Sequence, residues 1–142
     1  MTYTSTEFNH AMYALNPSCN WNYLHTGNEE CPETEEQFAN VGYYAPESRS
    51  YKHSLVPFTW EQLKNQLALS RTVLQWQDLR VTRDKLLAET DWMVTMASET
   101  GNPISDAWKT YRQTLRDLPA NTSDPANPCL LYTSDAADDR VS

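Results

Sequence analysis

A run without glycine or proline extends from Trp60 to Thr100. This run constrains the possible folds of the 142-residue chain more than any other feature. Thr59 and Gln62 form a T-x-x-Q start signal, in which hydroxyl and amide satisfy two backbone N–H groups. The spacing predicts a helix from Trp60 to about Thr90. At 1.5 Å per residue such a helix is roughly 45 Å long. Part of its apolar face must therefore meet another helix or another chain. That face carries Leu63, Leu67, Leu74 and Val81, widened by Leu79, Leu86 and Leu87.

A second helix is predicted after a loop marked by Gly101, Asn102 and Pro103. Ser105 or Asn102 caps it, Asp106 places negative charge in its first turn, and Pro119 ends it. The residues on its apolar face are Ile104, Ala107, Trp108, Tyr111, Leu115 and Leu118.

These two helices, separated by about a dozen residues, predict a mainly α fold built on an antiparallel αα-hairpin. We expect Trp92 to be buried against Trp108 or Tyr111, so that its removal costs about 3 to 5 kcal/mol. The predicted organisation has an irregular region at 1–57, the hairpin at 58–119, a proline-rich extended segment at 120–128 and a disordered tail at 129–142.

The region 1–57 has four prolines and no sustained helical or strand period, so we expect loops and short turns. A short helix over 34–39 is an exception, because Thr34 and Gln37 resemble a capping box. Its many aromatic residues are unusual for a solvated linker and favour partial order on a partner. Whether this region folds alone stays open.

The ten residues from Cys129 to Asp138 correspond to the in-frame translation of a transposase sequencing adapter, TGT CTC TTA TAC ACA TCT GAC GCT GCC GAC. We therefore expect 129–142 to be an artefact of a truncated metagenomic sequence, with the native C-terminus missing. The alternative is a real acidic tail.

Composition narrows the classes of function. The formal net charge is −8, and 1–48 contains glutamates but no Lys or Arg, which disfavours nucleic acid and anionic membranes as partners. No apolar run reaches the roughly 20 residues of a membrane span, and no secretion signal begins the chain.

We expect a cytoplasmic protein with reduced Cys19 and Cys31. Both thiols could bind zinc with His25, but the spacing lacks close cysteine pairs. We predict no metal, no cofactor and no enzyme, because nothing assembles a nucleophile or base.

The stretch from Arg80 to Pro119 resembles the phage tail assembly chaperone family. The resemblance rests on an R-x-x-L-L-x-x-x-D-W segment followed, after a loop, by a Y-R-Q-x-L-R-D helix. It implies a small protein of a tailed bacterial virus that assists tail or tail-fibre assembly in the cytoplasm of the infected cell. The residues that match the family motif are Arg83, Leu86, Leu87, Asp91, Trp92, Trp108, Tyr111, Arg112, Leu115, Arg116, Asp117 and Pro119.

Two interpretations of the charged residues stay open. Arg80 and Asp84 are four residues apart on the first helix and favour an ion pair. Arg112 and Arg116 are one turn apart on the second helix, and the charged residues that could approach them across the closed hairpin are Arg83, Asp84, Asp91 and Asp117. Such pairs could clamp the hairpin, or Arg112 and Arg116 could dock on a tail protein. The partner-binding prediction comprises Arg112, Arg116, Leu63, Leu67 and Leu74, with a homo-oligomer as another way to cover the leucines. The alternative function is a minor structural protein of the virion tail or fibre.

Overall fold

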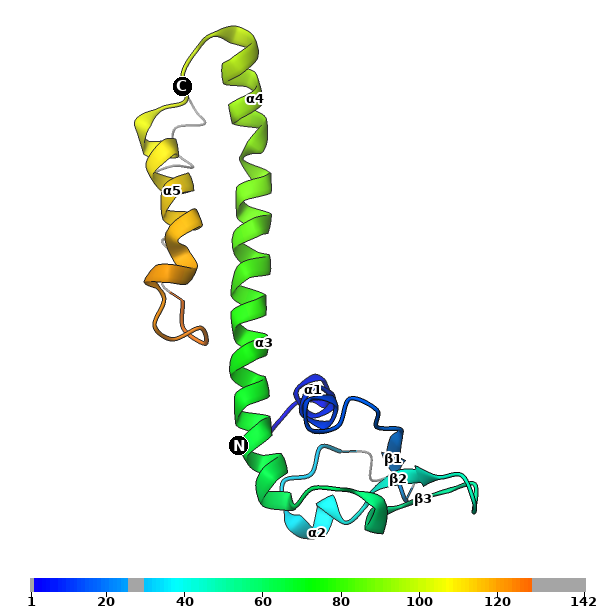
Figure 1. Ribbon diagram of the computed structural model, residues 1–142. Coiled ribbons are helices and arrows are strands. Elements are labelled where there is room, and N and C mark those ends of the chain that lie inside the picture. The colour runs from blue at the N-terminus through cyan, green and yellow to red at the C-terminus, as the bar shows by residue number, and fades with distance from the viewer. Residues whose placement is uncertain (1, 26–29, 129–142) are drawn as a thin grey trace. The chain divides into compact units, whose positions relative to one another are not determined.

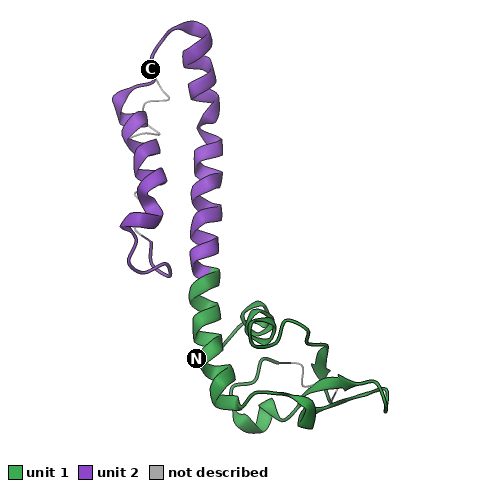
Figure 2. Ribbon diagram, in the orientation of Figure 1, with its two compact units in different colours: residues 1–74 green, residues 75–142 purple. Residues whose placement is uncertain are grey.

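A computed structural model describes residues 2–25 and 30–128. The chain consists of two compact units, Met1–Leu74 and Gln75–Ser142 (Figure 2). The predicted adapter-derived segment, 129–142, lies outside the described residues. The protein is mainly helical, as predicted, but a small sheet is present as well (Figure 1).

The N-terminal unit begins with α1 (Ser5–Leu15), which the sequence analysis did not predict. Thr4 caps this helix: its hydroxyl accepts from the Glu7 N–H at 3.2 Å, and its own N–H donates to Glu7 Oε2 at 2.7 Å. This reciprocal capping box satisfies two backbone donors that a helix start leaves open. Phe8, Ala11 and Met12 are fully buried on the inner face of the helix.

A three-stranded antiparallel sheet follows, formed by β1 (Trp21–Tyr23), β2 (Val41–Ala45) and β3 (Ser50–Lys52) in the order β1-β2-β3. The predicted capping box is confirmed in α2 (Glu35–Phe38), where Thr34 and Gln37 satisfy each other's backbone N–H groups. A 3-10 turn, η1 (His53–Leu55), follows β3.

Our prediction that the N-terminal region is irregular is therefore wrong for the residues that the structure describes. Its aromatic side chains pack within the first compact unit itself. Phe8 contacts Trp21 edge to face with 5.0 Å between ring centroids, and Phe38 stacks on Phe58 with 6.1 Å between ring centroids. Short elements lack a long periodic pattern, so their burial depends on contacts between distant segments. The core comprises Phe8, Ala11, Met12, Cys19, Cys31, Phe38, Val41, Tyr43, Phe58, Leu63 and Leu67.

The long helix, α3 (Trp60–Glu89), confirms the predicted bounds. Thr59 N–H donates to Gln62 Oε1 at 2.9 Å and Thr59 Oγ1 accepts from Gln62 N–H at 3.2 Å, as the start signal predicts. Leu63 and Leu67 are both fully buried in the N-terminal core. The prediction that they bind a partner is thus corrected, because the chain's own first unit covers them.

A separate helix, α4 (Asp91–Thr100), replaces the long loop that we predicted after Thr90. It ends at Gly101, which adopts a left-handed conformation with φ of 72° and donates its N–H to Ala97 O at 3.0 Å. Glycine accepts this conformation without the steric cost of a Cβ atom. Only 101–105 connects α4 to the next helix.

The last helix, α5 (Asp106–Asn121), starts where predicted, with Ser105 Oγ accepting from Trp108 N–H at 3.4 Å. Pro119 does not end it, contrary to our prediction, because α5 continues for two more residues. Proline removes a donor to the preceding turn but has a helical φ, so residues after it can complete the turn. Thr122 Oγ1 then donates to Leu118 O at 2.7 Å.

Candidate functional site

A buried arginine organises the C-terminal unit. Arg112 lies on α5 and its side chain is only 9% exposed. Its Nη2 donates to Asp91 Oδ1 at 2.7 Å, while Nη1 donates to Leu87 O at 3.1 Å and to the hydroxyl of Thr90. The sequence analysis had left open whether Arg112 clamps the helices or docks on a partner. The geometry favours the clamp and corrects the partner-binding prediction for this residue.

The position of Arg112 suits the break between α3 and α4. Thr90, with φ of −109° and ψ of 0°, separates the two helices, so carbonyls at the end of α3 lose helical donors. The guanidinium supplies N–H groups there, and its positive charge faces the negative end of the α3 dipole. Asp91 places a carboxylate in the first turn of α4, where the dipole favours negative charge. Arg112 thereby stabilises the end of α3, and its partner Asp91 stabilises the start of α4.

The aromatic packing of this unit differs from our prediction. Trp108 is 8% exposed and packs edge to face on Tyr111, with 5.6 Å between ring centroids. Trp92 is 51% exposed, so its predicted burial against Trp108 or Tyr111 is wrong. Periodicity alone placed Trp92 at a helix exit, but the start of α4 turns that side chain outward. Among the described residues of this unit, the buried apolar ones are Leu79, Trp108, Leu115 and Leu118.

The other charged motif residues form local contacts. The predicted pair between Arg80 and Asp84 is wrong: Arg83 binds Asp84 at 2.7 Å, and the Arg80 guanidinium lies 5.8 Å from the Trp76 ring centroid. Gln113 Nε2 donates to both oxygens of Asp117 at 3.0 Å. The motif leucines Leu86 and Leu87 are half-buried, as is Leu74 of the predicted partner-binding stripe.

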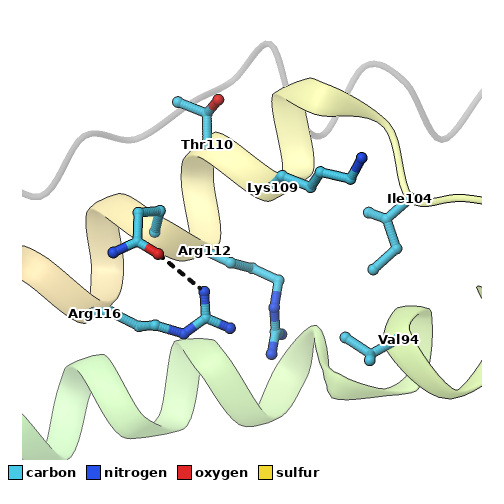
Figure 3. A pocket seen from close by; sticks show the side chains of 7 residues that line it. Val94, Ile104, Lys109, Thr110, Arg112 and Arg116 are labelled. Atoms are coloured by element: carbon cyan, nitrogen blue, oxygen red, sulfur yellow. Dashed lines mark hydrogen bonds between the residues drawn. The ribbon is translucent and has the colours of Figure 1, made fainter.

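A cavity of about 440 Å³ opens beside the clamp, within the C-terminal unit. Figure 3 shows that its walls combine apolar side chains from α4 and the following loop with polar and cationic side chains from α5. Neither this cavity nor Lys109 as one of its cations was predicted from the sequence. The signal was present, since Lys109, Arg112 and Arg116 are spaced by three and four residues and share one helix face. The lining residues are Val94, Ile104, Lys109, Thr110, Arg112, Gln113 and Arg116.

The helix α4 contains no buried residue among the ten it spans. Trp92, Val94 and Met96 are 51%, 45% and 47% exposed, respectively. Trp92 and Met96 are four residues apart and share one face of this helix, whereas Val94 lies on the face that lines the cavity. An exposed tryptophan beside an exposed methionine is typical of a protein-interaction surface. We call the surface defined by Trp92 and Met96 the α4 surface.

The alternative zinc site is not assembled. Cys19 and Cys31 are free, buried thiols, and in 2–25 and 30–128 no three His, Cys, Asp or Glu side chains are arranged to hold a metal ion. Burial, followed by repulsion from Glu7 and Glu33, raises the pKa of Cys31 to about 11. A thiol binds metal as its thiolate, so this environment disfavours coordination. Among the described helices, none is long and apolar enough to cross a bilayer.

Comparison with known proteins agrees with the motifs. The model of a family described as phage tail assembly chaperone protein matches residues 76–130, less than half of the chain, and the match begins one residue after the start of the second compact unit. No curated protein and no solved structure matches the chain. The matched segment contains the clamp between Asp91 and Arg112, the cavity and the α4 surface. The predicted resemblance is confirmed: residues 76–130 match the phage tail assembly chaperone family.

Proposed function

We propose that this protein is a non-enzymatic phage tail or tail-fibre assembly chaperone that binds a tail protein transiently through its C-terminal unit. The family match over residues 76–130 carries the proposal. The proposed place of action is the cytoplasm of the infected cell. The alternative, a minor structural protein of the virion, differs in that the chain stays in the particle.

The binding element of this proposal is an antiparallel helical hairpin. The short connection at 101–105 and the contacts of Arg112 with Leu87, Thr90 and Asp91 support a reversal of the chain between α4 and α5. A client can lay an apolar segment against an exposed helical surface, as amphipathic partners do in grooves. Tryptophan and methionine are enriched at such interfaces, so the α4 surface is the contact that we assign to the tail protein.

Burial supports the non-enzymatic part of the proposal. His10 Nδ1 lies 2.9 Å from Ser70 Oγ, which superficially resembles a base beside a nucleophile. Ser70 is fully buried and its hydroxyl also lies 3.5 Å from Gln66 Nε2. A substrate does not reach a hydroxyl in this position, so the pair is structural.

Co-expression with candidate tail and tail-fibre proteins from the same source genome tests the function. We expect one of them to co-purify with the chain and to gain soluble yield, while the chain is absent from purified particles. The variant carrying Trp92→Ser and Met96→Ser should lose the client. Val81→Ser is the matched control, because Val81 is 67% exposed on α3 and lies outside the α4 surface.

Two outcomes decide between the candidate functions. Stoichiometric recovery of the chain from purified virions favours the structural alternative over the chaperone. Failure to bind any tail component, with folding verified by circular dichroism, contradicts both.

A further inference from the structure

The cavity beside the clamp has an uneven distribution of charge. Three cations line it, and the guanidinium of Arg112 is already paired with Asp91 at 2.7 Å. Arg116 Nη1 donates only weakly to a neutral acceptor, Gln113 Oε1, at 3.5 Å (Figure 3). In the part of the chain that the structure describes, no carboxylate oxygen lies within the 4.0 Å of an ion pair from Arg116.

Neighbouring carboxylates do not neutralise the guanidinium group of Arg116. Asp117 is adjacent in sequence, but both of its oxygens accept from Gln113 Nε2. Lys109 Nζ lies 3.4 Å from Asp106, and those side chains are 57% and 99% exposed. An exposed pair of this kind contributes little and exchanges readily with another anion. The cavity therefore offers a guanidinium and an ammonium group to a ligand.

The opposite wall of the cavity is apolar. Val94 of α4 is 45% exposed, and Ile104 follows from the connecting loop. A volume of about 440 Å³ exceeds the space of a single carboxylate and is within the range of pockets that bury small ligands. The walls therefore match a ligand that carries a negative charge beside an aliphatic group.

We propose that this cavity binds an acidic peptide segment of the client, with an Asp or Glu carboxylate on Arg116 and a neighbouring aliphatic side chain on Val94 and Ile104. This inference rests on the proposed function and specifies the chemistry of its partner. Arginine can bind a carboxylate through two parallel N–H groups, which adds geometric selection to charge. Nucleic acid fits less well, because a chain of net charge −8 with so few available cations cannot neutralise a phosphate backbone.

A blocked peptide tests the proposal without knowledge of the client. The probe is N-acetyl-Gly-Glu-Leu-Gly-amide, which has no terminal carboxylate, and its controls replace Glu by Gln or Leu by Gly. Titration into the ¹⁵N-labelled full chain should shift the Arg116 Nε–H signal and the amides of Val94 and Ile104. We expect each control peptide to bind more weakly, the Gln peptide by about tenfold, the range of a hydrogen bond to a charged group.

Matched variants separate the site from general electrostatics. Arg116→Gln should weaken binding of the Glu peptide about tenfold. Lys85→Gln removes the same charge from an exposed position on α3 outside the cavity and should change binding less than twofold. Arg116→Lys keeps the charge but loses the bidentate geometry, so it should fall between them. Arg116 is exposed, and circular dichroism checks that each variant folds.

The inference is wrong if the Gln peptide binds equally well or if Arg116→Gln binds the Glu peptide like wild type. Tighter binding of a single-stranded RNA oligonucleotide than of the peptide, with the same dependence on Arg116, also overturns it. The two proposals can fail separately. If wild type and Arg116→Gln both retain a tail protein, the cavity assignment is wrong and the proposed function stands. If the peptide binds but no tail protein does, the cavity assignment stands and the proposed function is wrong.

Discussion

Arg112 Nη2 lies 2.7 Å from Asp91 Oδ1, which joins the middle of α5 to the first turn of α4. The two residues belong to different segments of the family motif, and the structure brings them into contact. The arginine is 9% exposed on its side chain, whereas the aspartate is 64% exposed. The pair therefore orients a mostly buried cation that also donates to Leu87 O and Thr90.

Replacing Arg112 by Met should destabilise the C-terminal unit, because the Leu87 carbonyl loses its donor and Asp91 loses its counter-charge. We expect a loss of about 1 to 3 kcal/mol, the range for polar groups left without a hydrogen-bond partner, because the exposed Asp91 carboxylate is solvated once the arginine is removed. Amide hydrogen exchange of α5 measures this loss separately from the N-terminal unit. Arg116→Met is the control and should change stability by less than about 0.5 kcal/mol, because its side chain is exposed. Equal effects of the two substitutions would contradict the clamp.

The two tryptophans of the C-terminal unit should respond differently to truncation. Trp108 is 8% exposed, so Trp108→Ala should cost about 3 to 5 kcal/mol. Trp92 is 51% exposed and buries only about half as much surface, so Trp92→Ala should cost less, about 1 to 2 kcal/mol. Urea denaturation of each variant, followed by circular dichroism at the helix band, gives both values. A larger loss for Trp92 than for Trp108 would restore our original sequence-based expectation.

The ion pair between Glu7 and Arg71 should make the N-terminal unit sensitive to acid. Arg71 Nε and Nη2 donate to the Glu7 carboxylate at 2.6 and 3.1 Å, and this contact holds the pKa of Glu7 below its ordinary value of 4.5. A lowered folded-state pKa stabilises the unit above pH 4.5, and that contribution is lost as the pH falls through the folded-state value.

The comparison with Glu7→Gln isolates this contribution. At pH 7 the variant should be less stable by about 1 to 3 kcal/mol, the range for a hydrogen bond to a charged group. Below the folded-state pKa, the difference from wild type should shrink, because the protonated Glu7 no longer carries charge. Free energies of unfolding from urea titrations across this pH range measure the trend. A constant difference at all pH values would show that the pair does not titrate with folding.

Gly42 of β2 should not tolerate a side chain. A Cβ atom there would lie 2.5 Å from Leu24 Cδ2 and 2.9 Å from the backbone nitrogen of Lys52. The leucine can shift, but the paired strand cannot move without losing its register. Gly42→Ala should therefore cost about 1 to 3 kcal/mol through overpacking. Faster hydrogen exchange in β2 and β3 would report this loss, and unchanged protection would contradict it.

The sequence predicted the elements whose signals are local. Three helix starts were predicted correctly, because a cap binds backbone groups within three residues. They are marked by Thr34 with Gln37, by Thr59 with Gln62, and by Ser105. The same kind of signal occurs at Thr4 and Glu7, followed by Phe8, Ala11 and Met12, and it marks the start of α1, a helix that we did not predict. The absence of Gly and Pro before Gly101 likewise permitted α4.

The candidate site was only partly accessible from the sequence. The motif identified Asp91 and Arg112 and left their role open, whereas the cavity beside Val94 and Ile104 was not predicted at all. A cavity depends on side chains from three separate segments, and spacing along one helix cannot reveal its opposite wall. Lys109 was detectable from its spacing to Arg112 and Arg116, but not its place in the cavity lining.

Local signals in the sequence were enough to predict the helix starts, the long helix from Trp60 to Glu89 and the family resemblance, because they rest on hydrogen-bonding groups and motif residues close together in the chain. Tertiary structure decided which apolar residues become core. Leu63 and Leu67 are covered by segments distant in sequence, while Trp92 is left at the surface. It also decided that Arg112 is a buried clamp, because burial and ion pairing depend on how remote segments of the chain meet.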